Sequence, residues 1–442
     1  MTRNHPFAKV SGMSGRHWRI PTLAALLLLA WEPTAQAQAT PSQGGPGSGG
    51  ALPAPPRALD LPPGPGVAIG IEDPSGQALA RFHGALRRAG RGEGQARVLF
   101  YGASHVAGDT FTGTVRRILQ SRFGDAGHGF VMPARPWYGY RHADINLDST
   151  DTWHTDRVGK KDDRRDGWYG LAGMSVASTS DQDYALVATT VDSEHGRSVG
   201  RIELWYLRQP GGGQLDVHLD GQLVRRIDSA SIVFETGYAT FDVEDGPHSV
   251  ELRPRGDGEV RLFGVTMDRL APGVIVDTLG INGARAAIHL QWDQELFREH
   301  LQRRDPDLIV LAYGTNESGD ARDPIFAYEL RLRTVVAQVK AAAPTASCLL
   351  IGPSDRPQKV GRRSWGPRPR TGALIAAQRR VAAEAGCGFF DLVAFQGGEM
   401  SMLDWVAAKP PLAQSDHVHF TRLGYERLGQ VLTAALLDGS GL

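Results

Sequence analysis

Apolar positions follow two different periodicities along this chain. In the first and last parts, short apolar runs alternate with longer segments of helical spacing. The runs predict buried strands over 98–101, 308–312, 349–352 and 388–392, and the longer segments predict helices over 73–90, 106–123, 324–343, 373–385 and 423–437. Strands that alternate with helices of this length are typical of a parallel sheet with helices on both faces. We therefore expect an α/β fold.

Between 150 and 270 the apolar positions instead recur at every second residue. Leu215, Val217 and Leu219 precede the turn residues Asp220 and Gly221, and similar short runs follow. This alternation predicts an antiparallel β-sandwich. Because the α/β pattern resumes afterwards, we expect 150–270 to be inserted into one α/β domain made of 67–149 and 271–442.

The first 66 residues have a composition of their own. Arg16 and Arg19 precede an apolar run over 23–31, and small residues follow at 35–39. These features predict a signal peptide over 1–39 and a periplasmic or secreted protein. Residues 40–66 are mostly Pro, Gly, Ala and Ser, which predicts a flexible linker. The mature chain contains no apolar run near the ~20 residues of a membrane helix, so we expect no membrane span.

Charge and cysteine content exclude several classes of partner. The chain has 48 basic and 48 acidic residues, and its densest basic stretch, 160–165, is interrupted by Asp162 and Asp163. We interpret that stretch as a solvated loop rather than a phosphate site, and expect no nucleic-acid partner. Cys348 and Cys387 lie in apolar, strand-like sequence, which favours two buried thiols over a disulfide. Neither is part of a metal-binding pattern, so we expect no metal.

Four short blocks carry residues suited to acyl transfer. They are Gly-Ala-Ser-His at 102–105, Gly-Ile-Asn-Gly at 280–283, Gly-Thr-Asn-Glu at 314–317 and Asp-His-Val-His at 416–419. In a parallel sheet the carboxyl ends of the strands converge, so distant blocks can meet. A serine nucleophile needs a base and a carboxylate that orients the base. This predicts Ser104 as nucleophile, His419 as base and Asp416 as orienter; helix capping is the alternative for Ser104 alone.

The same blocks supply donors for a developing oxyanion. We expect these donors to be the backbone N–H groups of Ser104 and Gly283 and the side-chain amide of Asn316. Gly280 is the alternative backbone donor, and closing a turn is the alternative role for Asn316.

In their order, the four blocks resemble the motifs of the SGNH, or GDSL-like, hydrolase superfamily. The resemblance implies a flavodoxin-like three-layer α/β/α fold and a serine hydrolase without metal or organic cofactor. Ala103 stands where the family has the aspartate of its serine motif, and Glu317 where it has the aspartate after the asparagine. Neither family position has a catalytic role, so the resemblance still implies activity.

The run 102–130 and the inserted β-domain resemble, more narrowly, the peptidoglycan O-acetylesterases of Gram-negative bacteria. In those enzymes the insertion resembles a carbohydrate-binding module. The resemblance implies an exported esterase that removes O-acyl groups from a polysaccharide. Acetyl is the acyl group and peptidoglycan the polysaccharide that it favours. Two alternatives stay open: a non-catalytic polysaccharide-binding protein, and an O-acetyltransferase that uses the same triad.

Aromatic and histidine residues near the blocks have further candidate roles. Trp137, Tyr138 and Tyr140 lie in a segment rich in Pro and Gly, where stacking on sugar rings and packing in the core are equally good interpretations. We expect His105 and His417, which adjoin catalytic candidates, to be exposed residues at the rim of the site. Core packing is favoured for the remaining pairs, Trp168 with Tyr169 and Trp205 with Tyr206.

Overall fold

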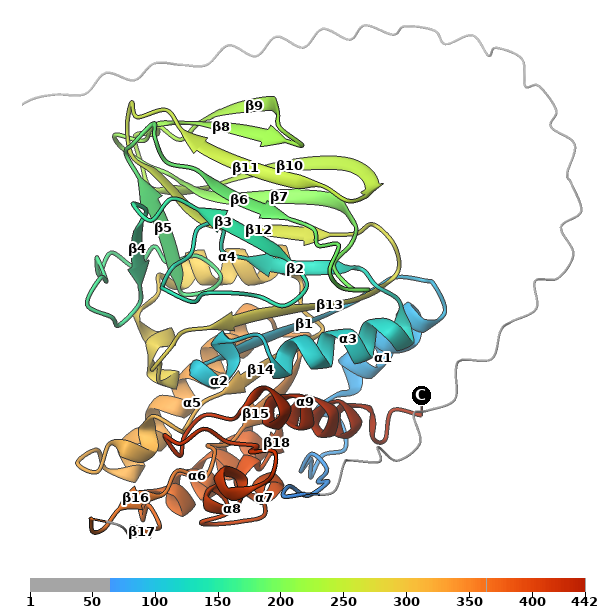
Figure 1. The fold of residues 1–442 in the computed structure, drawn as a ribbon, viewed down its shortest axis with the longest axis vertical. Coiled ribbons are helices and arrows are strands. Elements are labelled where there is room, and N and C mark those ends of the chain that lie inside the picture. Colours follow the sequence, from blue (N-terminus) through green and yellow to red (C-terminus); the bar gives the residue numbers. More distant parts are fainter. Residues whose placement is uncertain (1–63, 363, 442) are drawn as a thin grey trace, which may run out of the picture. The chain divides into compact units, whose positions relative to one another are not determined.

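The computed structural model describes residues 64–362 and 364–441, so the expected signal peptide and nearly all of the expected linker lie outside the described residues. Its centre is a five-stranded sheet whose neighbouring strands are all parallel. The order across the sheet is β13 (Gly273–Gly280), β1 (Gln95–Gly102), β14 (Leu308–Ala312), β15 (Ser347–Ile351) and β18 (Gly388–Phe390) (Figure 1). Taken in chain order this is 2-1-3-4-5, the flavodoxin-like arrangement. The expected fold class is confirmed.

Helices cover both faces of this sheet, because alternate side chains of each strand point to opposite faces. In β1, Val98 and Phe100 belong to one hydrophobic core, and Leu99 and Tyr101 to another. The first core includes residues of α1 (Ala80–Gly90), α3 (Phe111–Phe123) and α9 (Arg422–Leu437). The second includes residues of α4 (Gln294–Arg304), α5 (Ile325–Ala342) and α6 (Arg370–Ala385).

Two antiparallel sheets form the inserted part (Figure 1). One sheet has the order β10 (Glu235–Gly246), β7 (Val199–Arg208), β12 (Val260–Asp268), β5 (Met174–Ser178) and β4 (His154–Arg157), with β2 (Gly127–Val131) also paired to β12. The other has the order β3 (Asn146–Ser149), β6 (Ala185–Ala188), β11 (Ser249–Pro254), β8 (Gln214–Leu219) and β9 (Gln222–Asp228). The antiparallel strands therefore start before residue 150, with β2 and β3. The hairpin expected around Asp220 and Gly221 is β8 with β9.

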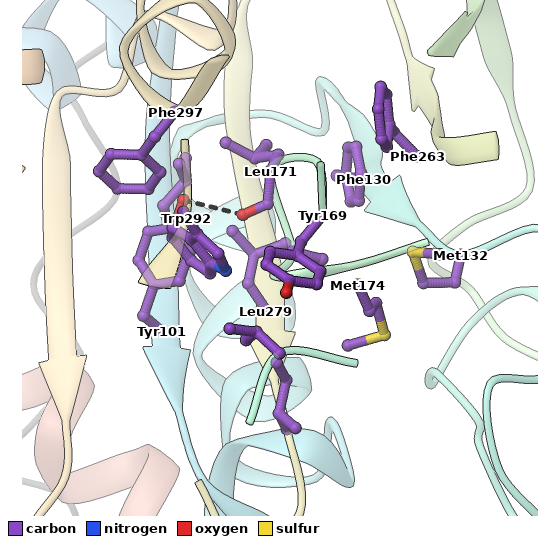
Figure 2. Close-up of a cluster of buried hydrophobic side chains, with 14 of the residues drawn as sticks. Tyr101, Phe130, Met132, Tyr169, Leu171, Met174, Phe263, Leu279, Trp292 and Phe297 are labelled. Carbon is purple, nitrogen blue, oxygen red and sulfur yellow. Dashed lines mark hydrogen bonds between the residues drawn. The ribbon is translucent and has the colours of Figure 1, made fainter. Parts of the chain in front are cut away.

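A shared hydrophobic core joins the antiparallel sheets to the parallel sheet. Figure 2 shows Tyr101 of β1 and Leu279 of β13 among side chains that come from the insertion, including Leu171 and Phe263. The hydroxyl of Tyr101 donates a hydrogen bond of 3.1 Å to the carbonyl oxygen of Leu171. The insertion is thus packed against the sheet over a buried apolar surface, and is not tethered by its two connections alone.

Short elements complete the described chain. They are α2 (Ser104–Ala107), the 3₁₀ helices η1 (Ala286–Gln291) and η2 (Glu317–Gly319), the two-stranded hairpin β16 (Gln358–Lys359) and β17 (Trp365–Gly366), α7 (Leu392–Gln396) and α8 (Met402–Ala407). None of the helices in the described range is both long and apolar enough to cross a membrane.

The single helix expected over 106–123 is wrong, because the chain forms α2 and α3 with a break between them. Asp109 adopts a left-handed backbone conformation, with φ 47°. Its buried carboxylate accepts hydrogen bonds from Arg116, Thr278 and the backbone N–H of Ala143, among others. These partners lie outside the local apolar pattern, so that pattern could not reveal the break.

The expectation of two free thiols is also wrong, because Cys348 and Cys387 form a disulfide. Leu349 of β15 lies opposite Gly388 of β18 in the parallel register, so the preceding residues, the two cysteines, are brought side by side. This proximity comes from pairing between strands, which the sequence around each cysteine does not specify.

Candidate active site

The carboxyl ends of three neighbouring strands bring the first three blocks to one edge of the sheet. Gly102 at the end of β1 lies opposite Gly280 of β13 on one side and Ala312 of β14 on the other. A Cβ at Gly102 would lie 2.3 Å from the Cγ2 of Val106 and 2.9 Å from the carbonyl oxygen of Ala312. Glycine at this position therefore allows α2 to start directly above the strand, with Ser104 as its first residue.

The structure brings Ser104, His419 and Asp416 into one hydrogen-bonded row. The Nε2 of His419 lies 2.8 Å from the Oγ of Ser104. The Nδ1 of the same ring lies 2.7 Å from the Oδ2 of Asp416. Each nitrogen of the imidazole thus has a partner of the kind that proton transfer from a serine to an oriented histidine requires.

Asp416 is held by its own loop as well as by the imidazole. Its Oδ1 accepts hydrogen bonds from the backbone N–H groups of Val418, at 2.9 Å, and of His419, at 3.0 Å. Partial burial acts to raise the pKa of Asp416, but the hydrogen bonds from the His419 side chain and from the two backbone groups outweigh it and lower the pKa below its usual value. The carboxylate therefore stays ionised at neutral pH.

The two candidate glycines of the second block have different surroundings. A Cβ at Gly280 would lie 2.3 Å from the backbone nitrogen of Ala107, so Gly280 allows the sheet to pack closely against α2. Gly283 is exposed, adopts a φ of 69° and faces the side chain of Lys160. Of the two, Gly283 is the residue whose backbone is accessible to a ligand.

Asn316 is fixed next to Gly283 through the neighbouring residue. Its Nδ2 donates a hydrogen bond of 2.8 Å to the carbonyl oxygen of Ala284. An amide nitrogen carries two hydrogens, so the second remains available for another acceptor. The half-buried Asn316 thus combines a held orientation with a free donor.

Glu317 is a site residue that sequence reasoning missed. Its carboxylate is buried and accepts hydrogen bonds from the backbone N–H groups of Ala286, at 2.8 Å, and of Gly314, at 3.0 Å. Burial raises the pKa of Glu317, although the backbone donors act against this effect. The residue ties the loop after Gly283 to the loop that carries Asn316. The replacement of a family aspartate at this position was the only signal for it.

The expected exposed position of His105 is wrong. The side chain is buried, with Nδ1 2.9 Å from the hydroxyl of Tyr425 and Nε2 3.1 Å from the Oγ of Ser354. Burial is the main cause that lowers the pKa of His105 to about 3, so the ring is neutral. The expectation assumed an extended segment with alternating side chains, whereas residues 104–107 form a helix. His417 is half-buried and stacks on Trp365 of β17, with ring centroids 4.0 Å apart.

The three aromatic candidates border one cavity of about 870 Å³ in different ways. Tyr138 is fully exposed and Trp137 is half-buried. Tyr140 is buried, and its hydroxyl is engaged by the backbone N–H of Met132 and by His142. The structure thus leaves Tyr138 and Trp137 accessible to a ligand. Of the residues expected in the core, Tyr169, Trp205 and Tyr206 are buried, and Trp168 packs partly buried against them.

Asp109, His128 and His142 form a buried group with ligand-type atoms within 4.8 Å of one another. Both nitrogens of His142 already have hydrogen-bond partners, the Nε2 of His128 and the hydroxyl of Tyr140. The carboxylate of Asp109 is paired with the guanidinium of Arg116 at 2.6 Å. We interpret the group as a hydrogen-bonded network that supports the loop after α2, because a cation already occupies the carboxylate.

Comparison with known proteins gives a match to a family model and a similar fold among solved structures. The GDSL-like lipase/acylhydrolase family model matches residues 253–427, a range that contains Asn316, Asp416 and His419. A solved structure described as a peptidoglycan O-acetylesterase in action has a TM-score of 0.69 and 24% sequence identity, and covers 84% of this chain and 99% of its own. A search of curated proteins gives no match.

Other solved structures are more distant. A family two carbohydrate esterase from Cellvibrio japonicus has a TM-score of 0.28 and 12% identity, over 66% of this chain and 97% of its own. An acetyl xylan esterase has a TM-score of 0.28 and 16% identity, over 37% of this chain and 80% of its own. The family-model match over residues 253–427 and the shared fold agree with the resemblance of the four blocks to the SGNH, or GDSL-like, hydrolase superfamily.

Proposed function

We propose that this chain is an exported serine esterase that removes O-acetyl groups from a polysaccharide, with Ser104, His419 and Asp416 as its catalytic triad. The observation that carries the proposal is the 2.8 Å separation between the Nε2 of His419 and the Oγ of Ser104. With Asp416 bound to the other ring nitrogen, His419 accepts the serine proton as Ser104 attacks the ester carbonyl.

The tetrahedral intermediate places a negative charge on the former carbonyl oxygen. The donors proposed for it are the backbone N–H groups of Ser104 and Gly283 and the free N–H of the Asn316 amide, each worth roughly 3 to 4 kcal/mol in a water-poor site. Collapse of the intermediate releases the sugar hydroxyl, which takes the proton from His419, and leaves an acetyl group on Ser104. Water then attacks this acyl-enzyme with His419 again as base, and acetate leaves.

Peptidoglycan is the polysaccharide that the comparisons favour. The solved structure with the TM-score of 0.69 is described as a peptidoglycan O-acetylesterase, and it shares the fold over 84% of this chain. The basic residues, apolar run and small residues in the first 39 positions support export to the compartment where this polymer lies. Trp137 and Tyr138, beside the 870 Å³ cavity, are proposed to stack on sugar rings of the polymer.

The test is acetate release from O-acetylated peptidoglycan and from acetylated xylan, with the wild-type chain and the Ser104→Ala variant. We expect the wild-type chain to release acetate from peptidoglycan and to release less from xylan. The Ser104→Ala variant, folded like wild type, should release none above background. Release by a folded Ser104→Ala variant would exclude Ser104 as the nucleophile. Binding without release by wild type would favour a non-catalytic polysaccharide-binding protein. Transfer of acetyl to an added sugar in preference to water would favour an O-acetyltransferase.

A further inference from the structure

Lys160 reaches the candidate site from the inserted part of the chain. It lies in the loop between β4 and β5, and its side chain is half-buried. A Cβ at Gly283 would lie only 3.1 Å from the Nζ of Lys160. The ammonium group is therefore next to the glycine proposed to bind the oxyanion. The basic stretch 160–165, expected to be a solvated loop, thus sends one cation to the site.

The loop that carries Lys160 is fixed in place. Val158 is fully buried, and its backbone N–H donates to the carbonyl oxygen of Gly173 at 3.1 Å. The N–H of Lys160 donates to the carbonyl oxygen of Arg157 at 3.0 Å, and the N–H of Gly159 donates to the Asp163 carboxylate at 2.8 Å. The backbone of Lys160 is therefore already ordered, and only its side chain loses conformational freedom on binding.

The cations around Lys160 differ from it in having acidic partners. Arg157 is paired with Asp162 at 2.6 Å, and Arg285 is paired with Asp320 at 2.6 Å. Within the part of the chain that the structure describes, the Nζ of Lys160 makes neither a hydrogen bond nor an ion pair. Asp162 is the carboxylate whose charge acts on Lys160, and it is already bound by the guanidinium of Arg157. This leaves a partly desolvated positive charge at the site, which is unfavourable until an anion binds.

The aromatic surface proposed to bind sugar rings adjoins the loop. The guanidinium of Arg157 lies over the ring of Trp137, 5.9 Å from its centroid, and Trp137 borders the 870 Å³ cavity with Tyr138. A glycan held by these aromatic residues would therefore approach the site beside the β4–β5 loop.

The geometry points to Lys160 as a specificity-determining residue that binds a carboxylate of the acylated saccharide, close to the ester under attack. The inference rests on the proposed function and narrows its substrate class to acidic sugars. In peptidoglycan, the lactyl ether of muramic acid supplies such a carboxylate when no peptide is attached to it. The enzyme would then act after a reaction that cleaves the amide between the lactyl group and the peptide.

Two soluble substrates of nearly equal size test the charge alone. They are 6-O-acetyl-N-acetylmuramic acid and the methyl amide of its lactyl carboxylate. For wild type we expect kcat/KM to be about 10- to 100-fold higher for the acid, since a charge-assisted hydrogen bond of ordinary strength has this effect. The Lys160→Met variant should reduce this preference to near unity, while Lys160→Arg should keep most of it. Lys161→Met, which removes the exposed neighbouring ammonium, is the matched control and should keep the wild-type preference.

The possible outcomes distinguish a failure of this inference from a failure of the proposed esterase function. A Lys160→Met variant with the wild-type preference would overturn the inference. So would equal losses on acid and amide, because these would indicate that Lys160 acts on the oxyanion instead. Wild-type protein that cleaves both sugars equally would overturn the inference alone. Wild-type protein that cleaves neither sugar nor 4-nitrophenyl acetate would overturn the proposed function together with it.

Discussion

The buried carboxylate of Glu317 accepts a hydrogen bond of 2.8 Å from the backbone N–H of Ala286, and so fixes the loop of Gly283 against the loop of Asn316. Both loops carry donors proposed for the oxyanion, so their separation decides how well the transition state is bound. A second hydrogen bond is local, because the same carboxylate also accepts from the N–H of Gly314 at 3.0 Å. Glu317 is therefore a positioning residue.

Replacing Glu317 by Gln should lower kcat on a small acetyl ester more than it raises KM. The amide keeps one acceptor but turns an N–H group toward the second backbone donor, which costs about 1–3 kcal/mol of stability and shifts one loop. Steady-state kinetics and urea unfolding measure the two effects. Glu329→Gln, which breaks ion pairs with Arg333 and Arg380 on α5 and α6, should lower stability without changing kcat. Equal kcat in both variants would show that Glu317 has only a structural role.

Tyr138→Ala should lower the ratio of polymer turnover to small-ester turnover. The ring is fully exposed, so its removal leaves the hydrophobic core covered. A bound polymer would lose the stacking interaction with this ring, which contributes about 1 kcal/mol or more to binding. The ratio of kcat/KM for O-acetylated peptidoglycan to that for 4-nitrophenyl acetate measures this. Phe326→Ala, which removes an exposed aromatic ring on α5 that does not line this cavity, serves as the control. An unchanged ratio for Tyr138→Ala would exclude the ring from polymer capture.

Removal of the disulfide should lower stability and leave the site intact. The bond between Cys348 and Cys387 closes a loop of 39 residues, for which the chain-entropy relation gives about 4 kcal/mol. We expect the double variant Cys348→Ala, Cys387→Ala to unfold at lower urea concentration, with unchanged kcat on a small ester. Unchanged stability would contradict a disulfide in the native protein.

Buried histidines should make the protein less stable as the pH falls. His300 packs against Trp205 and Phe263, and burial lowers its pKa to about 3. In the unfolded chain this histidine is protonated as the pH falls below about 6.5, whereas in the folded chain it stays neutral down to about pH 3. Its contribution to the free energy of unfolding is therefore complete above about pH 6.5 and is lost as the pH falls toward 3. Between about pH 7.5 and 5.5 this histidine accounts for about 1.4 kcal/mol. In urea unfolding, the free energy of unfolding of His300→Phe should change less between these two pH values, by that amount. An unchanged pH dependence would show that His300 is not desolvated in the folded protein.

Local patterns were sufficient for the parallel sheet, because a buried strand and an amphipathic helix are each encoded within a few neighbouring residues. The expected strand over 308–312 is β14, and the expected helix over 324–343 is α5 within one residue at each end. The flavodoxin-like strand order was implied by the resemblance to the SGNH superfamily, and the four blocks indicated which strand ends would meet.

The remaining features depend on contacts between distant segments, which no local pattern specifies. Asp109 breaks the helix because Thr278 and Ala143 bind its carboxylate. His105 is buried because Tyr425 and Ser354, far along the chain, close over it. Lys160 reaches Gly283 only because the insertion packs against the parallel sheet through a common core.

The central claim is that Ser104 is a nucleophile activated by His419. Labelling with a fluorophosphonate, followed by mass spectrometry of the digested protein, tests it most directly, because this reagent modifies a serine only where a base activates it. We predict a single adduct on the peptide that contains Ser104 in the wild-type chain, and its loss in the folded His419→Ala variant. An adduct on another serine, or labelling of Ser104 that does not depend on His419, would contradict the account.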